Sequence, residues 1–284
     1  MSRIVKVRNV KIGDGIPKIC IPITDTDFDG VKKSVRLIEN SPHDMVEWRA
    51  DFYKDLADPE VRIKPMMYLR NSLPDDPILF TIRTSVEMGV LEIDTADYVT
   101  LNLAVIDSGL IDLVDVELSR GDKAVRTVVE AAHKAGVKVI VSRHNNINTP
   151  DRDVIVGNLC QMQDLGADIV KFAVTPRSER DVLRLLDATL AMKEDHNTTP
   201  VITMSMGKLG VISRICGEVF GSAVTFGTAG KASAPGQLPA NQLSIYLKSL
   251  NRQKPKKTVK KRNIPRLHSL FSFLQMVDGL FKPF

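Results

Sequence analysis

Eight short apolar runs recur along the sequence at similar intervals, and this recurrence limits the possible folds more than any other feature. Successive runs begin 23 to 36 residues apart, and each interval holds a segment of helical period. In KAVRTVVEAAHKAG, for example, Val125, Val128, Val129 and Ala132 fall on one helical face. Apolar runs separated by amphipathic helices are typical of a parallel sheet covered by helices. The runs are KICIPIT from Lys18, MVEWRADF from Met45, PILFTIR from Pro77, LVDVEL from Leu113, KVIVSRH from Lys138, IVKFAVT from Ile169, PVITMSM from Pro200 and AVTFGT from Ala223.

Eight such units predict an α/β protein whose residues 1–250 form a closed (β/α)₈ TIM barrel. An open doubly wound sheet is the alternative. The segment IVKVRNVKIGDG, ahead of the first run, predicts an N-terminal hairpin or a cover over one mouth of the barrel. Pro22 cannot donate to a ladder, so we expect a bulge or a strand end at that position.

The basic character of the chain belongs to its C-terminal extension. Residues 251–284 carry a net charge of +8 in a chain of net +5, so the first 250 residues carry −3. We therefore expect no nucleic-acid binding by the barrel. The extension predicts a basic linker followed by an amphipathic helix, which is a candidate for contact with a membrane or a protein partner. The apolar positions of that helix are Leu267, Leu270, Phe271, Leu274, Val277 and Phe281.

The cysteines and the N-terminus indicate a cytoplasmic protein. Cys20, Cys160 and Cys216 are odd in number and far apart, which favours structural thiols over disulfides or a zinc site. The N-terminal residues alternate apolar and basic side chains and do not resemble a signal peptide.

Polar residues recur where the predicted strands end. Active sites of barrels are built at the C-terminal ends of the strands, so these side chains are expected to meet at one mouth. Each has a simpler explanation by itself; Glu47 and Arg49, for example, are spaced to form an ion pair on one strand face. The candidates are Glu47, Arg49, Arg83, Glu87, His144, Lys171, Arg214, Ser233 and Gln237.

Lys171 is the most informative of these candidates because it lies inside an apolar run. Burial lowers the pKa of a lysine, and the neutral amine attacks a ketone or aldehyde to form an imine. His144 on the neighbouring strand end would move protons, and Glu87 would orient its imidazole. A buried pair between Lys171 and a carboxylate such as Glu47 is the structural alternative.

Other chemistries fit the sequence less well. The glycine-rich stretches match neither a dinucleotide fingerprint nor a P-loop, and no cluster of carboxylates and histidines predicts a metal site. Gly227 and Gly230 leave a phosphate-binding loop open as an interpretation. Ser233, Pro235 and Gln237 are more typical of a lid that hydrogen-bonds a hydroxyl or a carboxylate.

Taken together, these motifs resemble the type I 3-dehydroquinate dehydratases, the imine-forming enzymes of the shikimate pathway. The resemblance runs from about Pro17 to about Leu250. It rests on PKICIPI, VEWRADF, FTIRTSVEMG, the histidine of VSRHNNINTP, ADIVKFAVTP, and the long segment ITMSMGKLGVISRICGEVFGSAVTFGTAGKASAPGQ. It implies a (β/α)₈ barrel, commonly dimeric, that needs neither a metal nor an organic cofactor.

The resemblance also implies a role for each candidate residue. Lys171 would form an imine with the C3 ketone of 3-dehydroquinate. His144, oriented by Glu87, would remove a C2 proton and deliver a proton to the departing C1 hydroxyl. The substrate carboxylate and nearby hydroxyls would bind to Arg214, Ser233 and Gln237, and the ring hydroxyls and the region near the ketone to Glu47, Arg49 and Arg83.

Three positions depart from the family pattern. Met88 replaces the first of two glycines that usually follow the glutamate, and it would shift Glu87 if that turn needs a positive φ. Arg143 and Asn145 flank His144 where tyrosine and aspartate are usual. A class I aldolase or transaldolase, which needs a phosphate site, and an inactive barrel that acts as a binding protein remain the alternative functions.

Overall fold

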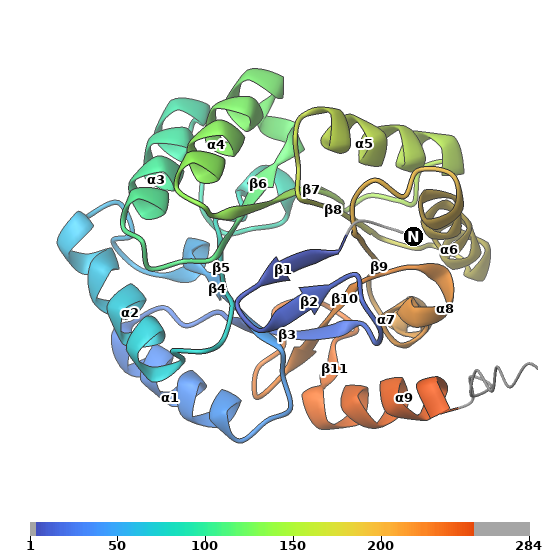
Figure 1. Cartoon of the computed structure of the whole chain (residues 1–284), viewed down its shortest axis with the longest axis horizontal. Helices are drawn as coiled ribbons and strands as arrows, with labels where there is room; N and C mark the ends of the chain where they lie inside the picture. The colour runs from blue at the N-terminus through green and yellow to red at the C-terminus, as the bar shows by residue number, and fades with distance from the viewer. Residues whose placement is uncertain (1–3, 253–284) are drawn as a thin grey trace, which may run out of the picture. The chain divides into compact units, whose positions relative to one another are not determined.

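The predicted barrel is confirmed. The computed structural model describes residues 4–252, and within them eight parallel strands follow one another around a curved sheet, with helices outside it (Figure 1). The sheet order runs from β10 through β3 and the intervening strands to β9, and a parallel bridge between Val201 and Ser222 links its two ends. These strands are β3 (Lys18–Ile23), β4 (Met45–Arg49), β5 (Ile78–Thr81), β6 (Leu113–Glu117), β7 (Lys138–Asn145), β8 (Ile169–Val174), β9 (Val201–Ser205) and β10 (Val224–Thr228).

The helices alternate with these strands, as the sequence predicts. In the helix that follows β6, the predicted apolar face of Val125, Val128, Val129 and Ala132 is buried. The short strand β11 (Leu238–Pro239) pairs with the end of β10. The helices are α1 (Phe28–Glu39), α2 (Pro59–Ser72), α3 (Thr95–Asp107), α4 (Asp122–Lys134), α5 (Arg152–Asp164), α6 (Glu179–Glu194), α7 (Val211–Ile215), α8 (Gly217–Phe220) and α9 (Ala240–Arg252), and the 3₁₀ turns are η1 (Ala50–Phe52), η2 (Ser85–Glu87) and η3 (Leu118–Arg120).

Acidic residues set the starts of several helices. The side chains of Asp27, Asp58 and Asp94 accept hydrogen bonds from backbone N–H groups in the first turns of α1, α2 and α3. Ser178 forms a capping box with Asp181 at the start of α6. Such caps bind donors that have no partner inside the helix, and the negative charge suits the helix N-terminus.

An antiparallel hairpin closes the N-terminal end of the barrel, as predicted. It consists of β1 (Val5–Val7) and β2 (Val10–Ile12), and it crosses the middle of the barrel in the view of Figure 1. Val5, Val7 and Ile12 are buried in one cluster with inward-facing residues from the strand starts. The interior of the barrel at this end is therefore filled with apolar side chains.

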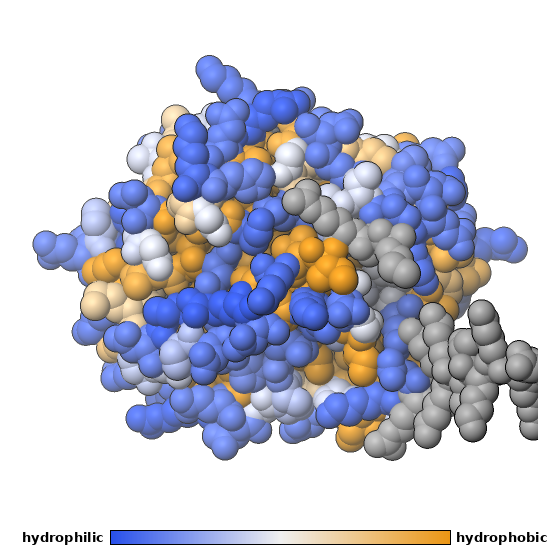
Figure 2. Space-filling model, in the orientation of Figure 1, coloured by the Kyte–Doolittle hydropathy of each residue, from blue (hydrophilic) through white to orange (hydrophobic). Residues whose placement is uncertain are grey.

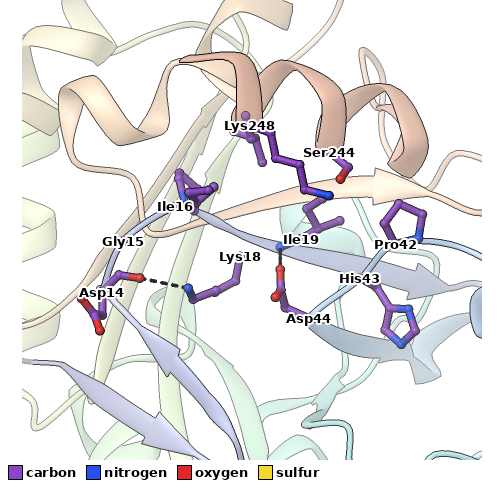
Figure 3. A pocket seen from close by; sticks show the side chains of 12 residues that line it. Asp14, Gly15, Ile16, Lys18, Ile19, Pro42, His43, Asp44, Ser244 and Lys248 are labelled. Atoms are coloured by element: carbon purple, nitrogen blue, oxygen red, sulfur yellow. Dashed lines mark hydrogen bonds between the residues drawn. The ribbon is translucent and has the colours of Figure 1, made fainter. Parts of the chain in front are cut away.

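At the same end, a polar side chain one or two residues before every second strand accepts a hydrogen bond from a backbone N–H of the preceding strand. Oδ2 of Asp44 accepts a hydrogen bond from Ile19 N at 2.7 Å, beside a pocket of about 440 Å³ (Figure 3). Asp112 binds Ile78 N at 2.8 Å in the same way. Asp168 and Ser222 repeat the arrangement on β7 and β9. These side chains satisfy strand donors that would otherwise lack an acceptor.

Pro22 lies next to the end of its strand, the second of the two arrangements expected for it. It is the penultimate residue of β3 and lies in register with Glu47 of β4. The ladder between β3 and β10 already ends at Cys20. The missing N–H of Pro22 thus falls beyond that ladder, where the strand is close to its end.

The predicted boundary after residue 250 falls near the end of α9, which continues to Arg252. Nearly all of the predicted linker and amphipathic helix of residues 251–284 lies outside the described residues. None of the helices in the described part of the chain has the length and hydropathy needed to cross a membrane.

Candidate active site

Lys171 lies at the centre of the barrel in a layer of four side chains. It is 4% exposed, and its Nζ is 3.1 Å from Asp115 Oδ2 and 3.7 Å from Glu47 Oε1. The ring of Phe226 completes the layer, with its centroid 4.7 Å from Nζ. The four residues come from β4, β6, β8 and β10, the alternate strands that share one layer in a barrel. In the sequence, position 171 seems unsuited to lysine. In the structure, the same position faces the barrel interior and has polar partners.

The carboxylate contacts of Lys171 include the structural alternative drawn from the sequence. Glu47 is indeed near the ammonium, and it also accepts a hydrogen bond from Thr81 Oγ1 at 2.9 Å. The ion pair between Glu47 and Arg49, which the sequence offered as a simpler explanation of the two residues, is not formed. Arg49 instead makes two 2.8 Å bonds to Asp51, and these hold its guanidinium at the strand end. Glu47 is thereby left facing Lys171.

His144 and Glu87 meet at the end of β7, as the sequence predicts. Glu87 Oε2 lies 3.0 Å from His144 Nδ1 and also accepts a hydrogen bond from His144 N at 2.9 Å. Because a carboxylate only accepts, the neutral imidazole carries its proton on Nδ1 and leaves Nε2 available as a base. One carboxylate oxygen thus fixes both the backbone and the ring of the histidine.

Burial and nearby charges tune this pair. Burial and the positive charges of Arg83 and Lys171 lower the pKa of His144 well below its usual value of 6.5. Burial raises the pKa of Glu87, against the opposing effect of Arg83. The imidazole is therefore neutral at physiological pH, which is the form that removes a proton.

Arg83 is buried within the site instead of lining an open surface. It is 3% exposed, and Nη2 lies 2.7 Å from Asp115 Oδ1. Nη1 is within 3.3 Å of Glu87 and 3.0 Å of Glu117, and it donates to Ser142 Oγ at 3.1 Å. Burial alone would lower the pKa of Arg83, but the surrounding carboxylates raise it well above its usual value.

Four residues of this network were not singled out from the sequence, namely Asp115, Glu117, Ser142 and Phe226. Asp115 and Glu117 alternate with apolar residues in LVDVEL, and both are fully buried in β6. A signal was present, because a charged residue inside a buried strand is as unusual there as at Lys171. The same argument, applied to every strand, identifies both acids.

Arg214, Ser233 and Gln237 form a second polar group, on the loops after β9 and β10. Ser233 N donates to Gln237 Oε1 at 2.8 Å, and Gln237 Nε2 donates to Ser233 Oγ at 2.9 Å. Arg214 Nη2 donates to the carbonyl of Pro235, between these two residues, at 3.0 Å. The structure therefore brings the three predicted residues together.

Arg214 is a buried cation with few partners. It is 2% exposed, and burial lowers its pKa to about 10. Its Nη1 lies 4.0 Å from the sulfur of Met204, a residue of the buried cluster at the barrel interior, and Nε has no hydrogen-bond partner among the residues that the structure describes. Within residues 4–252 no carboxylate forms an ion pair with it. A buried guanidinium in this state is suited to bind an anion.

The departures at His144 leave the imidazole undisturbed. Arg143 is exposed and donates to Asn158 Oδ1 at 2.9 Å, so it points away from the imidazole, as strand alternation predicts. Asn145 Oδ1 accepts from the N–H groups of Ile147 and Asn148 and thus closes the turn after β7.

The turn at Met88 does have a positive φ, the condition under which Met88 was expected to shift Glu87. Its φ is 71°, in the left-handed region, yet Glu87 still reaches His144. The side chain of Met88 is 43% exposed and thus loses little by lying in this turn. The next residue has no such freedom, since a Cβ on Gly89 would lie 1.7 Å from the carbonyl oxygen of Arg83.

Two substitutions test this turn. We expect Met88→Gly to raise the free energy of unfolding by about 0.5–1 kcal/mol, because the left-handed strain exceeds the added flexibility of glycine. Gly89→Ala should lower both stability and turnover, because the β5–α3 loop must move to admit the methyl group. Urea unfolding and steady-state rates measure both effects. A less stable Met88→Gly variant would show that the methionine side chain holds the loop.

Comparison with known proteins gives the same family as the resemblance noted in the sequence. Residues 19–254 match the family model of the type I 3-dehydroquinases. A 3-dehydroquinate dehydratase from Clostridium kluyveri is 46% identical over 252 residues, which cover 88% of this chain and 99% of the relative. The structure of a type I 3-dehydroquinate dehydratase from Clostridium difficile with covalently modified comenic acid superposes with a TM-score of 0.85 at 45% identity, covering 88% and 98% of the two chains. The enzyme from Geobacillus kaustophilus superposes with a TM-score of 0.86 at 37% identity, covering 90% and 100%. The chain belongs to the type I 3-dehydroquinase family.

Proposed function

We propose that this chain is a hydro-lyase that converts 3-dehydroquinate into 3-dehydroshikimate and water through an imine on Lys171. The observation that carries the proposal is the buried Lys171 of β8, with His144 on the adjacent strand β7 and Glu87 of η2 paired with that histidine. Such a lysine beside a neutral base matches a reaction that forms an imine and then removes a neighbouring proton.

The first step takes place at Lys171. Its ammonium must lose a proton before it attacks, and Glu47 Oε1, 3.7 Å from Nζ, lies within reach to accept it. The neutral amine then adds to the C3 ketone, and loss of water from the carbinolamine gives the imine. Protonation of the imine nitrogen makes it an electron sink, and this acidifies the C2–H bond.

The second step belongs to His144. Nε2 removes a C2 proton, and the electron pair forms the enamine. The imidazolium then gives this proton to the C1 hydroxyl, which leaves as water while the C1–C2 double bond forms. Hydrolysis of the imine returns the ketone and the free Lys171. Glu87 accepts from Nδ1–H throughout and stabilises the imidazolium between the two transfers.

The second polar group supplies recognition of the substrate. Arg214 is a buried guanidinium without a carboxylate partner among the described residues, so it is the group we assign to the substrate carboxylate. Ser233 and Gln237 are assigned to that carboxylate and the nearby hydroxyls. Glu47, Arg49 and Arg83 are assigned to the ring hydroxyls and the region around the ketone.

Borohydride trapping tests the imine. Sodium borohydride with 3-dehydroquinate should leave a reduced covalent adduct on Lys171, detected by mass spectrometry of the intact and digested protein. Lys171→Ala should give neither adduct nor turnover. His144→Ala is the matched control, since it should keep the adduct while turnover falls by about 10²–10⁴-fold.

Two outcomes would contradict the proposal. Absence of any adduct on the active wild-type protein would exclude the imine mechanism. Turnover of a sugar phosphate, with no turnover of 3-dehydroquinate, would favour an aldolase.

The pH profile tests the assignment of His144 and Glu87. Both groups must be unprotonated in the free enzyme, and the lowered pKa of His144 keeps it so at neutral pH. We therefore expect kcat/KM to be flat through neutrality and to fall only below pH 6.5, the usual value for histidine. A limb at or above that pH would mean that the imidazole is not depressed as the structure indicates.

We also propose that the chain acts as a homodimer in the cytoplasm. Hydrophobic atoms lie on the surface over α2 and α3 (Figure 2), and on α2 the side chain of Met67 is half exposed at 50%. A surface of this kind is typical of subunit contacts. Light scattering on the intact chain should give twice the mass of 31.5 kDa, and a monomer at working concentration would contradict the dimer.

A further inference from the structure

Glu117, the last residue of β6, binds the start of the loop that carries Glu87. It is 0% exposed, and Oε1 accepts from Thr84 N at 2.9 Å and from Arg83 Nη1 at 3.0 Å. Oε2 accepts from Thr84 Oγ1 at 2.6 Å. Both oxygens of this carboxylate are therefore used to hold Arg83 and Thr84, the second and third residues after β5.

The end of the same loop is tied to Glu117 through Arg120. Arg120 Nε lies 3.4 Å from Glu117 Oε2, and Arg120 Nη1 donates to the carbonyl of Ile93 at 3.0 Å. The loop of residues 84–93 is thus anchored at both ends to one buried carboxylate. Glu87 lies in this loop between the two anchors. The anchored loop therefore holds the Glu87 carboxylate against the imidazole of His144.

Glu117 also shares a cation with Glu87. Arg83 Nη1 lies 3.0 Å from Glu117 Oε1 and 3.3 Å from Glu87 Oε2. Burial raises the pKa of Glu117, Arg83 opposes this, and the negative charge of Glu87 raises it further. Two carboxylates that compete for one guanidinium nitrogen each make the other harder to ionise.

We propose that Glu117 is a positioning residue, which fixes the Glu87 loop and whose charge sets the pH below which the His144–Glu87 pair stops working. This inference rests on the roles proposed above for that pair. Glu117 needs no contact with substrate to act in this way, because its effects pass through Thr84 and Arg83.

Several charged or titratable groups surround Glu117, and they define the electrostatic change that its substitution makes. They come from β6 itself, from the β5–α3 loop, from η3, from α3 and from β7. These groups are Asp115, Arg83, Glu87, Arg120, Tyr98, whose hydroxyl accepts from Glu117 N at 3.1 Å, and His144.

Glu117→Gln removes the charge and keeps the shape. The amide oxygen can still accept from Thr84 N and Arg83, so the fold should persist. Removing a negative charge stabilises ionised Glu87 and disfavours the His144 imidazolium, so the acid limb of kcat/KM should move down by about one pH unit. Turnover should fall by about tenfold or more, because the loop loses one anchor. An unmoved limb would overturn the proposal even if turnover falls.

Two further variants separate charge from packing. Thr84→Val removes the Oγ1 hydrogen bond without changing any charge, so it should lower turnover and leave the acid limb in place. Arg120→Met removes a cation that faces Glu117, so it should move the limb to higher pH, opposite to Glu117→Gln. If Glu117→Gln does not fold, the Arg120→Met shift decides the question, and an unmoved limb there contradicts the proposal.

Borohydride trapping distinguishes a failure of this inference from a failure of the proposed function. A Lys171 adduct in wild type and in Glu117→Gln, together with an unchanged acid limb, would reject the role of Glu117 alone. If neither protein forms an adduct, the imine mechanism fails first.

Discussion

The carboxylate of Asp115 is the contact on which the rest of the site depends. One oxygen lies 3.1 Å from the ammonium of Lys171, and the other lies 2.7 Å from Arg83. Burial opposes ionisation of Asp115, but Arg83, Lys171 and a hydrogen bond from Ser142 hold its pKa below the usual value. A buried ion pair stabilises a fold only when the geometry is good and the remaining polar atoms are satisfied. Here the barrel supplies that geometry, since alternate strands bring the groups into adjacent layers.

The charged network divides into two parts with different tasks. Around Lys171, carboxylates and an aromatic ring surround the amine to which we assign imine formation. Around Arg83, the guanidinium links three acids, one of which, Glu87, also contacts the imidazole of His144. Arg214 stands apart from both, as a cation without an acid partner in the described chain, which suits the role proposed for it in binding an anionic substrate. Lys171, Arg83 and Arg214 thus differ in which carboxylates, if any, lie close enough to neutralise their charge.

The chain also shows which departures a family member can tolerate. Met88 lies in a left-handed turn with its side chain directed to solvent, and the backbone keeps Glu87 in place. Arg143 is exposed and points outward to α5, away from the imidazole. Gly89 permits no side chain, because the Arg83 carbonyl occupies the space that a Cβ would take. The two departures project away from the site, whereas a side chain at Gly89 would collide with the backbone that leads to Glu87.

The sequence by itself determined the eight strands, the hairpin and the lysine, because apolar periodicity and the cost of burying a charge are local properties. It also placed His144 at a strand end and Arg214 on the helix after the seventh strand. It did not reveal that Arg49 would pair with Asp51, or that Asp115 and Glu117 would bind Arg83. The Arg49–Asp51 pair joins residues only two positions apart. The contacts of Asp115 and Glu117 with Arg83 join residues on different strands and loops, and their partners are chosen by strand register and by the tilt of the strands, which place every second strand in one layer. Only the tertiary structure decided the contacts with Arg83. An ion pair forms between residues that are neighbours in space, whereas the sequence shows only which residues are neighbours along the chain.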